Sequence, residues 1–169
     1  MNTQLDELCE SENQKAIQDF IEEYRHELSL ENLNLALRTA ALTNNVSIAK
    51  YLITQGANCL TMALAEATSR NGTDDMIEFL LHQGADPHDW MAMENAIRKE
   101  DANAVQLLIN AGFNEWNKAL LSSVEFGLID FTLLFLRFYT PTTHDLELYT
   151  QALQRHPNVE LGRLLGIIP

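Results

Sequence analysis

Several residue types are scarce in this chain of 169 residues. Only two cysteines occur, Cys9 and Cys59, which are too few for a disulfide framework and indicate a reducing compartment. Basic residues are also scarce, because 11 Lys and Arg stand against 24 Asp and Glu, and the net charge is −13. A chain this acidic repels phosphates and anionic lipid surfaces. We therefore expect neither nucleic acid nor a membrane as a partner.

Long apolar runs are missing as well. The most apolar stretch, LIDFTLLFLRFY, is interrupted by Asp130 and Arg137, so it is too short and too charged to cross a bilayer. The first residues, MNTQLDELCESENQ, lack the basic start and apolar segment of a secretory signal. We expect a cytoplasmic protein without membrane insertion, or one of a host cytosol if it is exported without a cleaved N-terminal signal.

Motifs for catalysis are absent from the sequence. It contains no Gly-rich phosphate loop, no H-E-x-x-H and no G-x-S-x-G. One cluster of metal-binding residue types occurs, in HQGADPHD, with His82, Asp86, His88 and Asp89. However, Asp86 belongs to a repeated helix ending, and His82 suits the negative end of a helix. We therefore predict no metal, no cofactor and no enzymatic activity.

The sequence does contain a repeat with a period of 28 residues. The octets YLITQGAN, FLLHQGAD and LLINAGFN place Gly56, Gly84 and Gly112 at equal spacing. Apolar residues precede each glycine at the i, i+3, i+4 spacing of an amphipathic helix. Glycine readily adopts the left-handed conformation that ends a helix. Each octet therefore predicts a helix stop, and an Ala-, Leu- and Met-rich stretch upstream predicts a second helix.

The repeats divide the chain into structural units. We expect repeats over residues 31–59, 60–87 and 88–115, with Gly72 in the turn of the second, and a degenerate repeat over 116–139. Capping helix pairs are expected at 1–30 and 140–169, because the outer faces of a stack meet water. Together these units predict a single repeat domain spanning residues 1–169.

The helix pair followed by Gly-Ala-Asp resembles the ankyrin repeat. Ala40 and Ala41 match the small paired positions of that repeat, and residues 84–86 match its Gly-Ala-Asp ending. Two departures stand out: the Thr-Pro-Leu-His tetrad is absent, and the period of 28 leaves no room for the usual β-hairpin. Over residues 31–139, the resemblance implies an all-α, ankyrin-like α-solenoid of stacked helix-turn-helix repeats with short inter-repeat loops.

The resemblance also implies a function. Ankyrin-like arrays recognise other proteins, so it implies a non-enzymatic, monomeric protein–protein interaction module that binds through its concave face. One specific form is a bacterial or viral effector that acts on host proteins. The alternative is an acidic inhibitor or immunity-type protein that covers a basic site on an enzyme. Residues 1–31 contain nine acidic residues against two basic ones. This acidity indicates either a solvated outer face of the terminal helix pair or an acidic docking surface.

The candidate partner contacts lie in the turns and loops that change between repeats. They are Arg70, Asn71, His88, Trp90, Arg98, Lys99, Trp116 and Phe126. Arg70 and Arg98 are 28 residues apart, which predicts equivalent places on neighbouring repeats. Trp and Arg are common at interface hot spots.

The same residues also have structural interpretations. Trp90 and Trp116 are also suited to covering the core beneath shortened loops. The basic residues are also suited to pairing with nearby acids, which are Glu66, Glu94 and Asp101.

Overall fold

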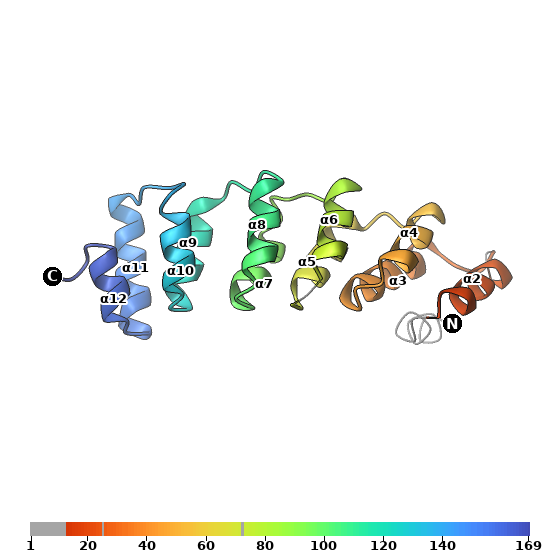
Figure 1. The fold of residues 1–169 in the computed structure, drawn as a ribbon, viewed down its shortest axis with the longest axis horizontal. Helices are drawn as coiled ribbons and strands as arrows, with labels where there is room; N and C mark the ends of the chain where they lie inside the picture. Colours follow the sequence, from red (N-terminus) through yellow and green to blue (C-terminus); the bar gives the residue numbers. More distant parts are fainter. Residues whose placement is uncertain (1–12, 25, 72) are drawn as a thin grey trace. The chain divides into compact units, whose positions relative to one another are not determined.

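The computed structural model describes residues 13–24, 26–71 and 73–169. The regular secondary structure in this part of the chain consists of α-helices, without any β-strand (Figure 1). The all-α prediction is therefore confirmed, and the arrangement agrees with a repeat-like helical fold. Residues 1–12 of the expected capping pair at 1–30, and the turn residue Gly72, lie outside the described residues.

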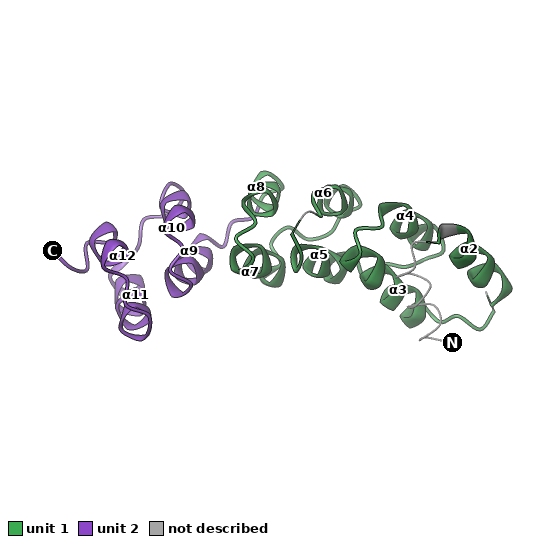
Figure 2. Ribbon diagram, turned by 60° about the horizontal axis from the view of Figure 1, so that its bottom comes forward, with its two compact units in different colours: residues 1–112 green, residues 113–169 purple. Residues whose placement is uncertain are grey.

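The chain divides into two compact units, residues 1–112 and residues 113–169 (Figure 2). The described helices of the first unit are α2 (Gln14–Glu23), α3 (Leu30–Leu42), α4 (Val46–Thr54), α5 (Leu60–Thr68), α6 (Asp74–His82), α7 (Trp90–Arg98) and α8 (Ala102–Asn110). Those of the second unit are α9 (Trp116–Glu125), α10 (Ile129–Phe135), α11 (Thr143–Arg155) and α12 (Val159–Leu164).

Polar side chains define where many of the helices begin. An Asn or Asp before the helix accepts a hydrogen bond from the backbone N–H three residues later, at 3.0 to 3.1 Å. The residues that do so are Asn13, Asn45, Asp89, Asp101 and Asn158. Ser29 and Thr142 form reciprocal capping boxes at the starts of the two 13-residue helices, α3 and α11.

The predicted glycine stops are confirmed. Gly56, Gly84 and Gly112 have φ of +109°, +97° and +112°. After α6 the Gly84 N–H donates to the Leu81 carbonyl and the Ala85 N–H to the Leu80 carbonyl, both at 3.0 Å. This pair of bonds satisfies carbonyls that have no partner inside the helix. The corresponding two bonds close α4 at Gly56 and Ala57.

The turns between α3 and α4, α7 and α8, and α9 and α10 use a similar closure. Asn44, Glu100 and Gly127 have φ of 58°, 55° and 74°. The residue after Glu100, Asp101, donates its N–H to the Ala96 carbonyl at 3.0 Å and then caps α8 with its side chain. The left-handed residue Glu100 therefore ends α7, and the residue that follows it, Asp101, is the N-cap of α8.

Helix pairs pack side by side within the first unit. The first helices of the pairs, α3, α5 and α7, contact one another in order, and the second helices, α4, α6 and α8, form a parallel row. Each of these first helices has a pair of fully buried alanines four residues apart, which allows α3, α5 and α7 to approach closely. The alanines are Ala36, Ala40, Ala63, Ala67, Ala92 and Ala96. In the second unit α9 packs on both α10 and α11.

The buried positions reveal a register that differs between the two rows. On the second helices the buried residues repeat every 28 positions, as in Ile48, Met76 and Ala104. On the first helices Ala36, Ala63 and Ala92 are equivalent, so the spacings are 27 and 29. The shift arises between the two helices of the second pair: Ala67 and Met76 are nine positions apart, whereas the equivalent buried residues Ala40 and Ile48, and Ala96 and Ala104, are eight apart. The α5–α6 segment therefore holds one extra residue.

This register corrects one sequence prediction. Arg98 is the last residue of α7, whereas Arg70 lies two residues beyond the end of α5. The position equivalent to Arg70 is therefore Lys99, and the position equivalent to Arg98 is Ser69. Arg70 and Arg98 consequently do not occupy equivalent places, although they are 28 residues apart.

Candidate protein-binding surface

Four of the predicted contact residues lie at the edge formed by the turns inside the helix pairs of the first unit. Arg70, Asn71, Arg98 and Lys99 are all exposed there. The Asn71 side chain donates to the Lys99 carbonyl at 3.4 Å, which links two neighbouring turns. The Arg98 guanidinium pairs with Glu94, 3.2 Å away and four residues earlier on α7. The basic residues therefore gather at one edge.

His88 and Trp90 lie at the opposite edge, formed by the loops between helix pairs. His88 is exposed and Trp90, the first residue of α7, is half-buried. A nine-residue helix separates its ends by about 12 Å, so Trp90 and Arg98 lie at opposite ends of α7. The eight predicted residues thus do not form one cluster.

The remaining two predicted residues belong to the second unit. Trp116 stacks on Phe138 with ring centroids 4.5 Å apart, and meets the edge of Phe113 at 5.6 Å. Phe113 is 1% exposed, so Trp116 covers buried aromatic surface. Phe126, at the other end of α9, is 45% exposed. These contacts favour the packing interpretation for Trp116.

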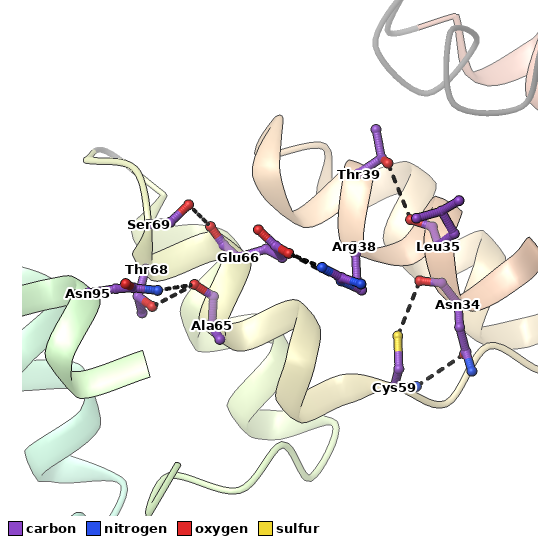
Figure 3. Close-up of polar contacts among 10 residues, drawn as sticks. All are labelled: Asn34, Leu35, Arg38, Thr39, Cys59, Ala65, Glu66, Thr68, Ser69 and Asn95. Atoms are coloured by element: carbon purple, nitrogen blue, oxygen red, sulfur yellow. Dashed lines mark hydrogen bonds and ion pairs between the residues drawn. The ribbon is translucent and has the colours of Figure 1, made fainter. Parts of the chain in front are cut away.

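A series of polar contacts connects the first helices of the first unit (Figure 3). Asn34 on α3 accepts hydrogen bonds at its Oδ1 from the N–H groups of Asn58 and Cys59, at 2.8 and 3.2 Å. Its Nδ2 donates to the Asn58 Oδ1 at 3.2 Å. One amide side chain thereby fixes the loop that leads into α5.

The next helix repeats this contact. Thr61 on α5 is equivalent to Asn34, and its hydroxyl accepts from the Asp86 N–H at 3.1 Å. Trp90 occupies the same place on α7, and its indole has no hydrogen-bond acceptor. The hydrogen bonds of Asn34 and Thr61 hold the loops between helix pairs in place, although the sequence lacks the Thr-Pro-Leu-His tetrad. Sequence reasoning missed them because they join residues of different repeats.

Two further contacts cross between the first helices (Figure 3). The Arg38 guanidinium on α3 forms an ion pair with Glu66 on α5, with its Nε 3.2 Å from the carboxylate. Asn95 on α7 donates to the Ala65 carbonyl of α5 at 2.9 Å. Glu66, which the sequence offered as a partner for the turn arginines, is therefore paired with Arg38.

An exposed apolar stripe runs over the same helices. Leu35, Met62 and Met91 each directly precede one of the equivalent buried alanines, so they occupy one position on α3, α5 and α7. Met62 and Met91 are 62% and 61% exposed, and Leu35 is half-buried. We call these three residues the methionine stripe. Alignment on the glycines pairs Met62 with Trp90 instead, which hides the stripe in the sequence.

A groove lies beside this stripe between α3 and α5. Its volume is about 440 Å³, and its wall residues are Leu30, Glu31, Asn34, Leu35, Arg38, Cys59 and Met62. Leu30 at the start of α3 is 50% exposed. The groove therefore continues the apolar stripe toward the loop edge.

The thiol in this groove is not activated. Burial raises the pKa of Cys59 above its ordinary value, although the nearby Arg38 opposes this shift. The Sγ donates to the Asn34 carbonyl at 3.2 Å. A thiol held in the protonated form is a poor nucleophile at neutral pH, so this residue has a packing role in the groove.

One carboxylate in the second unit accepts several hydrogen bonds. The Asp145 carboxylate accepts hydrogen bonds from the Thr142 hydroxyl and N–H at 2.6 and 2.8 Å, and from the Tyr139 hydroxyl at 2.7 Å. These bonds, led by that of the Thr142 hydroxyl, lower the pKa of Asp145. They form the capping box of α11, which is a structural use of the carboxylate.

No family model, curated protein or solved structure matches this chain. Within the described residues, His, Cys, Asp and Glu form no group of three that could hold a metal ion. No helix in the same part of the chain has the length and apolar character needed to cross a membrane. The surface described above is thus the basis for assigning a function.

Proposed function

We propose that this protein is a non-enzymatic binding module whose first-helix face in the first unit recognises another protein. The observation that carries the proposal is the methionine stripe, because Met62 and Met91 expose flexible apolar side chains at equivalent places on neighbouring helices. Methionine adapts to partners of varied shape and is common on protein-binding surfaces. Apolar groups that recur along one exposed face are typical of an interaction site.

The polar contacts around the stripe support this function. Arg38–Glu66 and Glu94–Arg98 are formed before any partner arrives, and Asn34 and Thr61 fix the loops. A surface ordered in advance loses less conformational freedom when it binds. The repeated helix pairs are compatible with an ankyrin-like α-solenoid. As part of the same proposal, the protein is a monomer that acts in the cytoplasm, or in a host cytosol as an effector.

Affinity capture with matched variants tests the proposal. Wild-type protein is compared with the double variant Met62→Asp/Met91→Asp, and with Leu133→Asp as a control. Leu133 is also an exposed apolar residue, at 45%, but lies in the second unit. We expect a partner, confirmed with purified components, that the double variant loses and the control retains. A partner lost only by Leu133→Asp would place the binding surface elsewhere.

The acidic-inhibitor form of the proposal rests on the net charge of −13. Opposite charges accelerate encounter with a basic partner, and salt weakens that attraction. Capture at increasing NaCl concentrations distinguishes the two forms. An inhibitor of a basic enzyme loses its partner progressively as salt rises, whereas a partner held mainly by the methionine stripe stays bound.

A further inference from the structure

The charge around the methionine stripe is distributed unevenly. At the loop edge, Glu31 and Asp86 are exposed and Asp89 is half-buried, and residues 55–59 and 83–89 include no Lys or Arg. Among the described residues, Glu31 forms no hydrogen bond or ion pair. The turn edge instead holds Arg70, Arg98 and Lys99, together with Glu100 and Asp101. A basic group next to the stripe is therefore favoured on the loop side.

The spacing of the stripe suits one kind of secondary structure. Neighbouring packed helices lie about 8–10 Å apart, so the three side chains Leu35, Met62 and Met91 recur at that pitch across the row. A helix laid across the row advances about 10.5 Å per heptad. Apolar residues seven positions apart on such a helix face the same side and match successive members of the stripe.

We propose that the stripe and the adjoining groove seat an amphipathic helix of the partner, with heptad-spaced apolar residues and a basic flank. The helix crosses α3, α5 and α7, and one apolar side chain enters the groove beside Leu35 and Met62. Its Lys or Arg residues face the loop edge, where Glu31 is available. This occupant rests on the proposed function and specifies the partner surface that the same face recognises.

The test uses a fluorescein-labelled synthetic peptide of three heptads, with Leu at the heptad core positions and Lys along one flank. Two peptides of the same length serve as controls: one has Glu in place of Lys, and one has a scrambled Leu order. Binding is measured by fluorescence anisotropy. We expect saturable binding of the heptad Lys peptide and at least tenfold weaker binding of both controls.

Protein variants test where the peptide binds. Met62→Gln/Met91→Gln should weaken binding at least tenfold, because it removes two apolar contacts and adds polar amides. Glu31→Gln should weaken binding several-fold. Glu22→Gln removes the same charge from an exposed position on α2 and should leave affinity unchanged. Circular dichroism and melting verify that each variant is folded.

The possible results separate the two proposals. Three outcomes would overturn the helix proposal. The heptad Lys peptide does not bind, the Glu peptide binds equally well, or Glu22→Gln and Glu31→Gln weaken peptide binding to the same extent. If the capture experiment still finds a partner that depends on the methionine stripe, the proposed function stands and only the helical occupant is wrong. If neither the peptide nor any captured partner depends on the stripe, both proposals fail.

Discussion

Single residues with positive φ determine where many of the described helices end. Gly84 illustrates the principle, because a Cβ added there would meet no atom within 4 Å and its φ is +97°. A substitution at this site is therefore opposed by backbone conformation and not by crowding. The local signal is strong enough to read from sequence, since it requires only the glycine and the apolar periodicity before it.

Gly84→Ala should lower the free energy of unfolding by about 1–2 kcal/mol, the cost of placing a side chain in the left-handed region. Urea denaturation followed by circular dichroism measures the change. Gln83→Ala is the matched control, because Gln83 is exposed and has an ordinary helical φ of −80°. Equal stability of Gly84→Ala and wild type would contradict the assignment of Gly84 as a left-handed helix end.

Glu100 presents the opposite case, since it is an ordinary residue held at a φ of 55°. Glu100→Gly should stabilise the protein by about 0.5–1 kcal/mol, because relief of the left-handed strain exceeds the added flexibility of the unfolded chain. Glu100→Gln removes the same charge but retains the Cβ, so it should show no such gain. Thermal melting of the two variants gives the comparison. A Gln variant as stable as the Gly variant would assign the gain to charge.

At the scale of elements, side-chain hydrogen bonds between neighbouring helix pairs hold the loops that connect the pairs. Asn34 serves two N–H groups of the following loop, and Thr61 serves one. The loops are partly open to water, so water can substitute in part for a lost acceptor. Each of these bonds is consequently worth about 1 kcal/mol.

Asn34→Ala should therefore destabilise the protein by about 1–2 kcal/mol, and more than Thr61→Ala. Amide hydrogen exchange provides the specific measurement, because the Asn58 and Cys59 N–H groups should lose protection. Asn34→Asp retains an oxygen acceptor and should preserve most of that protection. Unchanged exchange at both amides in Asn34→Ala would show that the side chain does not hold this loop.

The elements also show which features could be read from the sequence. The three glycine stops and the second helices were predictable, because their signals lie within about a dozen consecutive residues. The register of the first helices was not, since the extra residue in the α5–α6 segment shifts Met62 relative to Met91. The methionine stripe depends on that register. The aromatic contact of Trp116 with Phe138 is tertiary and has no local signal either.

At the scale of the whole molecule, acidity affects stability as well as partner choice. The net charge is −13. Several exposed carboxylates, such as those of Glu22, Glu23 and Glu27, form no ion pair with another described residue. Repulsion among like charges opposes the compact state. Salt shortens the range of that repulsion from about 30 Å at 0.01 M to about 10 Å at 0.1 M.

Raising NaCl from about 0.01 M to about 0.1 M should therefore increase the melting midpoint. A gain of about 1 kcal/mol corresponds to roughly 2–4 °C for a chain of this length. The triple variant Glu22→Gln/Glu23→Gln/Glu27→Gln should melt higher than wild type at low salt, and salt should raise its midpoint less. A midpoint that falls with salt would instead mean that attractive pairs such as Arg38–Glu66 and Glu94–Arg98 outweigh the repulsion.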